Sequence, residues 1–224
     1  MRKRRMRYVS CQSDNPPQFR FCGICGTALT NVARCHLTVM FCEVAGAAAL
    51  AAQLDPEDWH DVITIYQEAC SAIVQRFSGY IARQVGESLL VYFGYPQPHD
   101  EAPQQAVHAG LALIAVLPGV NARIQDTLGS QLTTPLQIRI GIHTGIAVVG
   151  EMGNKDYTES TALGETLNIA ARFMTLAAAN ALVIGEHTYR LVHDQFTCVS
   201  RGTHSLKGIS TPVLIYQVTA TRNA

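Results

Sequence analysis

Two glutamates stand where predicted strands end or turn, and carboxylates at such positions are suited to binding metal ions. Glu43 ends a predicted strand over residues 36–44, and Glu87 lies in the turn of a predicted hairpin. Two carboxylates that meet at a sheet edge can hold divalent cations, with substrate phosphates completing the coordination shell. The alternative is a pair of solvated turn residues, and spacing alone favours that alternative.

A second set of polar residues lies in the C-terminal half of the chain. Asn168 and Arg172 are spaced i, i+4 and therefore share one face of a predicted helix. An arginine so placed stabilises charge on a transferring phosphoryl group, and the asparagine orients that group. Lys207, before the last predicted strand, can reach a phosphate as a point charge. In isolation, each of the three is more simply explained as a solvated surface side chain.

Other residues with reactive side chains fit structural roles better. His143 ends a predicted strand, where a lone histidine is typically a hydrogen-bonded structural residue. Cys42 and Cys70 stand in apolar surroundings and are interpreted as core thiols. The glycine-rich run over residues 145–153 matches neither phosphate-loop pattern and indicates a tight hairpin.

The elements that position these side chains follow from the apolar periodicity of the sequence. Helices are predicted over residues 54–77, 101–117, 165–178 and 186–192. Strands are predicted over residues 36–44, 80–85, 88–93, 136–143, 146–149, 181–184, 197–200 and 213–218. Gly86-Glu87 and Thr144-Gly145 are the predicted turns of two hairpins. This order predicts an α+β sandwich in which helices cover a mostly antiparallel sheet.

Composition excludes several classes of protein. The 224 residues are 48% hydrophobic and 15% charged, which allows a packed core and excludes wholesale disorder. The net charge of zero is uneven, because residues 1–34 carry +6 and the remainder −6. The longest apolar stretch, over residues 109–117, stops at Pro118, whereas a membrane span needs about 20 apolar residues. We therefore expect no membrane span, a cytoplasmic location, and seven cysteines that are thiols or metal ligands.

Five segments taken together resemble the class III nucleotide cyclase catalytic domain, and most closely the bacterial soluble-type adenylate cyclases. They run in order from about Cys35 to Thr219 and read LTVMFCEVAG, GYIARQVGESLLVYFGYP, IRIGIHTGIAVVGEMG, TALGETLNIAARF and LKGISTPVLIYQV. The resemblance implies a catalytic domain over residues 31–220 with a ferredoxin-like βαββαβ core and additions. It also implies conversion of ATP to 3′,5′-cyclic AMP and pyrophosphate, with two Mg²⁺ or Mn²⁺ ions per site.

The resemblance assigns metal and purine roles to four positions. Glu43 and Glu87 take the places of the family's two metal-binding aspartates. Arg83 takes the place of the lysine that selects adenine, and Thr161 that of the residue that pairs with the adenine edge. Guanylate cyclases usually carry glutamate and cysteine at those last two positions, so the resemblance favours ATP as the substrate.

The remaining roles concern the ribose and the phosphates. Asn168 takes the place of the ribose-orienting asparagine, and Arg172 that of the arginine that stabilises the pentavalent transition state. Lys207 takes the place of the lysine that binds the triphosphate. In the family, the metal positions and the purine-selecting lysine position of one site belong to one chain, and the threonine, asparagine and arginine belong to the other. The resemblance therefore implies a dimer, either of two copies or with another cyclase chain.

The metal pair departs from the family pattern, because glutamate replaces both aspartates. Each side chain is one methylene longer, while Mg²⁺ requires near-ideal octahedral geometry. Two functions therefore stay open. One is an adenylate cyclase whose activity is weak or Mn²⁺-dependent. The other is a catalytically silent nucleotide-binding or regulatory dimerisation module.

The first 30 residues resemble a degenerate zinc ribbon. The segment YVSCQSDNPPQFRFCGICGTAL offers Cys11, Cys22 and Cys25 as candidate zinc ligands, whereas a structural zinc site normally has four. One interpretation is a ribbon that binds zinc poorly and mediates contacts, and the alternative is a relic that is partly disordered. The basic run over residues 2–7 has no interleaved aromatic residue and is interpreted as a solvated tail, so nucleic acid is not an expected partner.

Overall fold

The computed structural model describes residues 6–7, 14–15, 23–25, 33–129, 132–153, 158–209 and 211–222. Contacts divide the chain into two units, Met1–Arg34 with Val148–Ala162, and Cys35–Ala147 with Leu163–Ala224. In the first unit, β1 (Met6–Arg7) pairs with β2 (Asp14–Asn15) in an antiparallel ladder. The second unit holds most of the candidate site.

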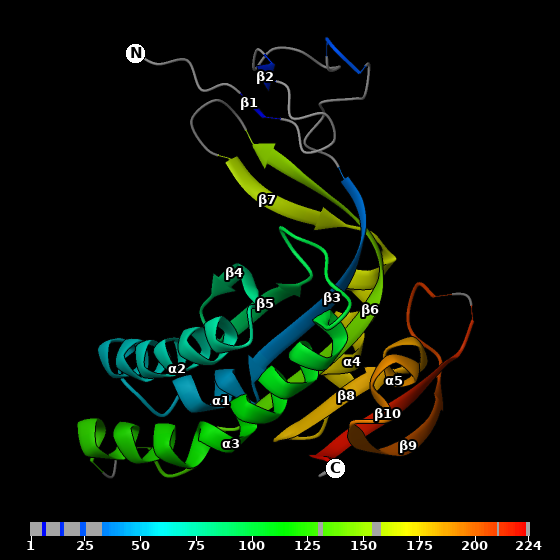
Figure 1. Cartoon of the computed structure of the whole chain (residues 1–224). Helices are drawn as coiled ribbons and strands as arrows, with labels where there is room; N and C mark the ends of the chain where they lie inside the picture. Colours follow the sequence, from blue (N-terminus) through cyan, green and yellow to red (C-terminus); the bar gives the residue numbers. More distant parts are fainter. Residues whose placement is uncertain are drawn as a thin grey trace, which may run out of the picture. The chain divides into compact units, whose positions relative to one another are not determined.

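In the described part of the chain, one eight-stranded sheet has the strand order β4-β5-β3-β6-β8-β10-β9, and β7 pairs with β6 (Figure 1). Its strands are β3 (Ala33–Val44), β4 (Tyr80–Val85), β5 (Ser88–Phe93), β6 (Ile138–Gly153), β7 (Thr158–Leu163), β8 (Ala181–Gly185), β9 (Phe196–His204) and β10 (Val213–Thr221). Strand β10 pairs antiparallel with β8 and β9, and β5 pairs antiparallel with β3 and β4, whereas β6 and β8 are parallel. The order β4-β5-β3-β6 is ferredoxin-like, which confirms the predicted α+β core.

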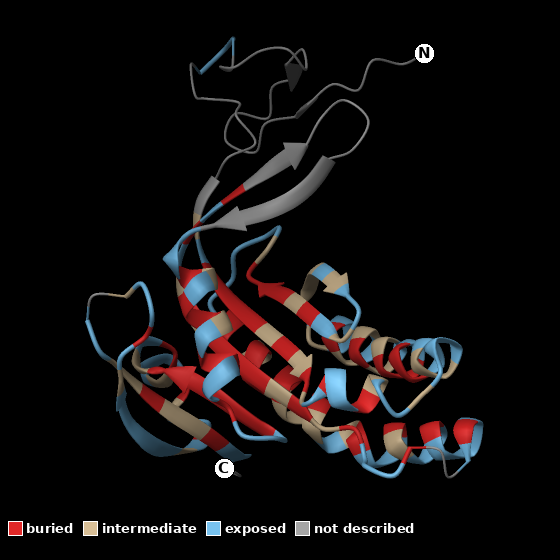
Figure 2. Ribbon diagram, turned by 180° about the vertical axis from the view of Figure 1, so that it is seen from behind, coloured by how far each residue is buried: buried red, intermediate tan, exposed pale blue. Residues whose placement is uncertain are grey.

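Helices cover both faces of this sheet. On one face, α2 (Pro56–Arg76), α3 (Ala102–Leu128) and α5 (Glu186–Val192) contribute to the larger core with every second residue of the central strands. On the other face, α4 (Glu165–Leu176) packs against β8 and β10 in a smaller core. Figure 2 shows the buried residues concentrated along the strands and on the sheet-facing sides of the helices. A short helix, α1 (Ala47–Ala51), which the sequence did not predict, follows β3.

The prediction that the second long helix ends at Leu117 is wrong. The helix continues through Pro118 to Leu128, although an internal proline removes a hydrogen bond and costs about 3 kcal/mol. Pro118 is exposed, whereas Val120, Ile124 and Leu128 beyond it are buried in the larger core. The burial of these residues offsets the cost of the proline.

The prediction of two strands joined by a turn at Thr144-Gly145 is also wrong, because β6 runs unbroken from Ile138 to Gly153. Thr144 is buried and hydrogen-bonded to side chains of other elements. A larger residue does not fit at position 145, because a Cβ there would lie 2.7 Å from the Thr166 hydroxyl oxygen. The glycine therefore allows close packing of α4, and no turn is needed to explain it.

Length and composition alone would allow α3 to cross a membrane, because it has 27 residues and its most apolar window has a mean hydropathy of 1.5. Its buried residues recur every three or four positions and pack in the larger core. That pattern is typical of a helix with one face against a sheet. The expected absence of a membrane span stays a prediction.

Candidate functional site

The structure brings the backbones of the two candidate metal ligands together. Glu43 pairs with Ser88 across β3 and β5, and the Val44 amide donates a 3.2 Å hydrogen bond to the Glu87 carbonyl oxygen. Both glutamate side chains are half-buried. Gln67 of α2 donates a 2.9 Å hydrogen bond to the Gly86 carbonyl oxygen, which fixes the hairpin turn. The end of β3 and the turn of the β4–β5 hairpin thus form one edge.

Arg139, which sequence reasoning missed, is the partner of Glu43. Its Nη2 atom lies 3.2 Å from Glu43 Oε1, and the two side chains are 31% and 23% exposed. Thr38 contacts Thr144 and Ala45 contacts Gln137, so β3 and β6 run antiparallel and bring Arg139 opposite Glu43. The only available sequence indication was a basic residue in a predicted buried strand.

The two carboxylates fit a divalent cation by their chemistry, because oxygen ligands suit Mg²⁺ and Mn²⁺. Among the described residues, no group of three or more histidine, cysteine or acidic side chains could hold a metal ion. The pair would therefore depend on oxygens from a nucleotide to complete the coordination shell. The Arg139 guanidinium would compete with a cation for Glu43.

The core behind this edge holds two buried thiols of low reactivity. Cys42 is fully buried, and its sulfur lies 3.3 Å from the Tyr66 hydroxyl oxygen. Burial raises the pKa of Cys42 and raises that of Cys70 to about 12, while burial and the neighbouring thiols raise the pKa of Tyr66. Both cysteines are free thiols in the core, as predicted.

Arg83 lies on the same sheet face as Glu43. Arg83 on β4 pairs with Leu90 on β5, and Leu90 pairs with Phe41 on β3. Phe41 lies two residues before Glu43 on the same strand. Because side chains alternate along a strand, Phe41 and Glu43 share a face. Arg83 is exposed. This face is the one opposite α2 and α3.

Helix α4 lies on that same side of the sheet, further along. Arg139 and Gly141 are two residues apart on β6 and therefore lie on the same face of the sheet. A Cβ on Gly141 would overlap the Ala170 carbonyl oxygen and the Met174 backbone of α4. The exposed face of α4 carries Asn168 and Arg172, as the i, i+4 spacing predicted. Helix α4 therefore presents a cation and an amide to solvent on the face that carries Glu43.

Two other predicted ligands lie on different elements. Lys207 is exposed in the turn that precedes β10, where Gly208 has a φ of 85°. Thr161 belongs to β7 in the first unit, and its side chain lies outside the described residues. The roles of both stay predictions.

His143, on β6, is half-buried against α4 and β8. Its ring meets that of Phe173 edge-on at 5.6 Å, and its Nδ1 atom has no hydrogen-bond partner among the described residues. Burial, and then the charge of His187, lowers the pKa of His143 to about 4. A structural role for His143 stays a prediction, and its Nδ1 atom lacks the hydrogen bond that we expected.

The candidate zinc ligands are largely beyond what can be described. Cys11 and Cys22 lie outside the described residues, and Cys25 is exposed in the turn Gly23–Cys25. A zinc site and a ribbon over residues 1–30 stay predictions, and so does the boundary at residue 31.

Comparison with known proteins gives consistent matches over most of the chain. The family model "Adenylate and Guanylate cyclase catalytic domain" matches residues 32–220. The crystal structure of the adenylyl cyclase CyaB from P. aeruginosa is 31% identical with a TM-score of 0.80, covering 85% of this chain and 97% of that one. The guanylyl cyclase Cya2 is 26% identical with a TM-score of 0.81, covering 86% and 96%.

A curated relative is much longer than the region it shares with this chain. Adenylate cyclase 1 of Rhizobium meliloti (strain 1021) is 27% identical over 192 residues, which are 83% of this chain and 28% of that protein. The chain therefore spans less than a third of that relative. The similar proteins include both adenylate and guanylate cyclases.

Proposed function

Because the chain belongs to the family of adenylate and guanylate cyclase catalytic domains, we propose that it converts ATP to 3′,5′-cyclic AMP and pyrophosphate between two copies of itself. The observation that carries the proposal is the edge at which Glu43 and the Glu87 turn meet, beside Arg139. Arg83 and Thr161 support ATP over GTP through the family resemblance.

Each residue has a task that suits its position. Glu43 and Glu87 would hold the divalent ions, which when bound supply positive charge to the phosphates and polarise the attacking hydroxyl. Asn168 would orient the ribose from the exposed face of α4. Arg172 would stabilise the charge that develops on the α-phosphoryl group. Lys207 would hold the triphosphate as a point charge.

Within one copy, these groups are spread along one side of the sheet. The carboxylates lie at the β3–β5 edge, whereas Asn168 and Arg172 project from α4, which packs on β6 and β8. A second copy facing this side would bring the α4 residues of one chain to the carboxylates of the other. This arrangement supports a site shared by a homodimer.

One observation favours the silent nucleotide-binding module as a second candidate. Glu43 forms an ion pair with Arg139, and this ion pair occupies the carboxylate that a metal ion needs. A metal must displace the guanidinium before it binds. If it does so poorly, the domain binds nucleotide without turnover.

The test is an assay of cyclic AMP formation by the purified chain with Mn²⁺-ATP and with Mg²⁺-ATP, and of cyclic GMP formation with GTP. The double variant Glu43→Asp with Glu87→Asp shortens both carboxylates and should raise the Mg²⁺-dependent rate by up to ~100-fold. Glu68→Asp, exposed on α2, is the matched control and should change nothing.

Product from the wild-type chain would establish a working cyclase with an unusual metal pair. Product from the double variant alone would establish the silent module with an intact scaffold. Absence of cyclic nucleotide from both proteins with either metal would contradict the proposal.

A further inference from the structure

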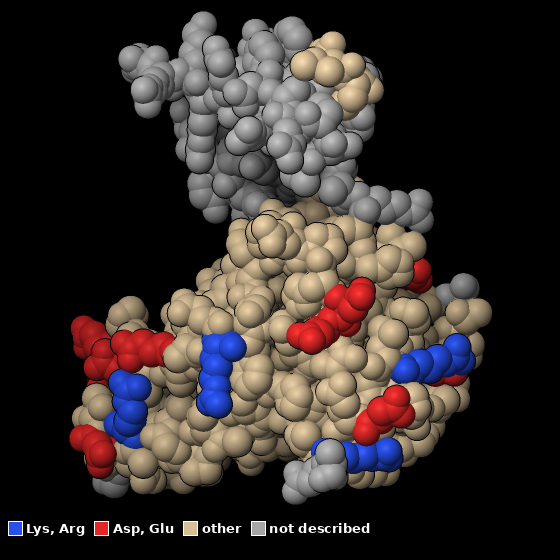
Figure 3. All heavy atoms as spheres, viewed as in Figure 1, with Lys and Arg blue, Asp and Glu red and all other residues tan. Residues whose placement is uncertain are grey.

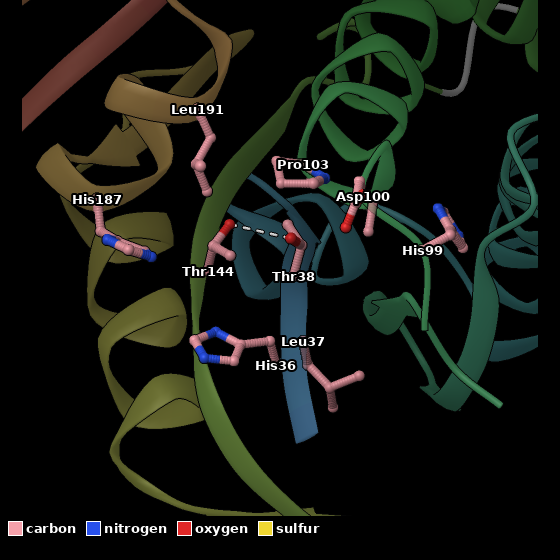
Figure 4. A pocket seen from close by; sticks show the side chains of 10 residues that line it. His36, Leu37, Thr38, His99, Asp100, Pro103, Thr144, His187 and Leu191 are labelled. Atoms are coloured by element: carbon pink, nitrogen blue, oxygen red, sulfur yellow. Dashed lines mark hydrogen bonds between the residues drawn. The ribbon is translucent and has the colours of Figure 1, made fainter. Parts of the chain in front are cut away.

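A separate cavity of about 320 Å³ lies at the other end of the β3–β6 pair (Figure 4). It is bounded by the start of β3, the first turn of α3, the middle of β6 and α5. Thr38 in its wall is five residues from Glu43 along β3, a separation of roughly 17 Å. The cavity is therefore distinct from the carboxylate edge.

The inner wall of the cavity is buried and contains two threonines. Leu37 and Thr38 are each 1% exposed, and Thr144 is 6% exposed. The Thr38 and Thr144 hydroxyl oxygens lie 2.9 Å apart, and Figure 4 shows both in the cavity wall. Apolar contacts come from Leu37 and the buried Pro103.

The hydroxyl network leaves one proton without an acceptor. Thr188 donates its proton to the Thr144 oxygen at 3.2 Å, and its own oxygen accepts the Thr144 amide at 2.9 Å. The Thr38–Thr144 bond uses one of the two remaining hydroxyl protons. The other proton, on Thr38 or Thr144, meets no acceptor among the described residues. A buried donor of this kind requires an acceptor from a ligand or water.

The rim of the cavity is exposed and rich in imidazoles, which are donors in one or both ring positions. The exposed polar residues that line it are His36, His99, Asp100 and His187. The first turn of α3 also faces this cavity, and its N-cap Glu101 makes no side-chain cap hydrogen bond. Donors and the positive end of a helix favour an anion, whereas the Asp100 carboxylate disfavours a second negative charge.

We propose that this cavity binds a small monocarboxylic acid. One carboxylate oxygen accepts the free hydroxyl proton of the Thr38–Thr144 pair, and the rim imidazoles donate to the carboxylate. The apolar part of the acid packs on Leu37 and Pro103. A cavity of about 320 Å³ has room for a small acid such as butyrate or benzoate.

The experiment uses the full chain with ¹³C-labelled threonine and leucine methyl groups, observed by NMR. Butyrate and benzoate are the probes. Each should shift the methyl resonances of Leu37, Thr38 and Thr144 in a saturable way. Benzamide, which lacks the charge, succinate, which carries two, and inorganic phosphate should bind at least about fivefold more weakly. Binding is read on the protein itself, so the result is independent of cyclase activity.

Two variants locate the site. Thr38→Val keeps the shape but removes the hydroxyl, and it should weaken benzoate binding about five- to tenfold. Thr219→Val deletes a hydroxyl hydrogen bond on β10 and is the matched control. Should Thr38→Val fail to fold, His187→Leu changes an exposed rim residue and should weaken binding similarly.

Three outcomes would overturn the proposal. One is the absence of saturable shifts with butyrate and benzoate up to about 10 mM. Another is equal benzoate binding by wild type, Thr38→Val and His187→Leu. The third is equal or tighter binding of benzamide or phosphate, which would assign different ligand chemistry to the cavity.

Discussion

The ion pair between Arg139 and Glu43 sets the electrostatics of the candidate site at the level of single residues. Both side chains are partly exposed, so solvent weakens their attraction and leaves the pair exchangeable. Nucleotide phosphates offer the guanidinium another anionic partner, and a divalent cation offers the carboxylate another positively charged partner. Arrival of a metal–nucleotide complex would thus satisfy both charges at once.

Arg172 is the side chain whose loss should be most costly for turnover. Arg172→Ala should lower the rate of cyclic AMP formation by about 10²–10³-fold, because it removes a donor aimed at developing charge. Steady-state kinetics with Mn²⁺-ATP measure the effect. Arg190→Ala on α5, where Arg190 pairs with Glu186, is the control and should retain full activity. Full activity of Arg172→Ala would contradict a role of Arg172 in the reaction.

His143 should make stability depend on pH. Its pKa falls from 6.5 in the unfolded chain to about 4 in the native protein, so the unfolded state binds more protons between these values. The contribution of neutral His143 to the free energy of unfolding is fully present above pH 6.5. It is lost as pH falls toward 4, and the loss is about 3 kcal/mol at most. Urea unfolding at a series of pH values measures this loss.

A variant isolates the contribution of His143. His143→Phe cannot be protonated, and its unfolding free energy should vary less between pH 6.5 and 4.5 than that of wild type. His60→Gln, at an exposed position on α2, should keep the wild-type slope. An unchanged slope in His143→Phe would assign the pH dependence to other groups.

At the level of elements, the position of α4 depends on glycines in the strands beneath it. A Cβ on Gly185 would lie 2.7 Å from the Phe173 ring, and a Cβ on Gly145 the same distance from the Thr166 hydroxyl oxygen. These small residues let the helix approach the sheet closely, and close approach fixes where Asn168 and Arg172 stand. The polar face of α4 is thus positioned by apolar contacts on its other side.

Gly141→Ala should destabilise the protein by about 1–3 kcal/mol, because the added methyl group meets helix backbone, which cannot rotate away. Gly119→Ala is a matched control inside α3, where nothing lies within 4 Å of the added Cβ. It should be neutral or stabilise the protein by about 0.5–1 kcal/mol. Thermal unfolding compares the two variants, and equal melting temperatures would contradict the close packing described here.

At the level of the whole molecule, surface charge and exposed apolar side chains bear on the association of two copies. Residues 35–224 carry a net charge of −6, but basic and acidic side chains lie interspersed on the described part of the face in Figure 3. Val85, on the face that carries Arg83 and Ser88, is 63% exposed. An apolar side chain beside the proposed site supports contact with a second copy.

Complementation tests whether two chains share one site. Glu43→Gln with Glu87→Gln removes the carboxylates, and Asn168→Ala with Arg172→Ala removes the α4 groups, so each protein alone should be inactive. An equal mixture should recover about a quarter of wild-type activity, because half the dimers are mixed and each holds one intact site. If the mixture stays inactive while native mass spectrometry shows subunit exchange, the shared site is contradicted.

The sequence by itself determined the elements whose patterns are local. The hairpin 80–85 and 88–93 and the helix 186–192 match the structure in both bounds, because turn residues and periodicity act over a few positions. The carboxylates at a strand end and a turn, and the shared face of Asn168 and Arg172, follow from the same local rules. The ferredoxin-like topology came from the family resemblance.

The tertiary structure alone decided which distant residues meet. Arg139 pairs with Glu43 across 96 positions of sequence, and Thr144 bonds Thr38 across 106, so no local pattern contains these contacts. Helix α3 continues through Pro118, and strand β6 continues through Gly145. In both, burial against other elements outweighs the local preference of these residues to end a helix or a strand. Periodicity reports which face of an element is apolar, but the partner that covers that face is fixed only when the chain packs.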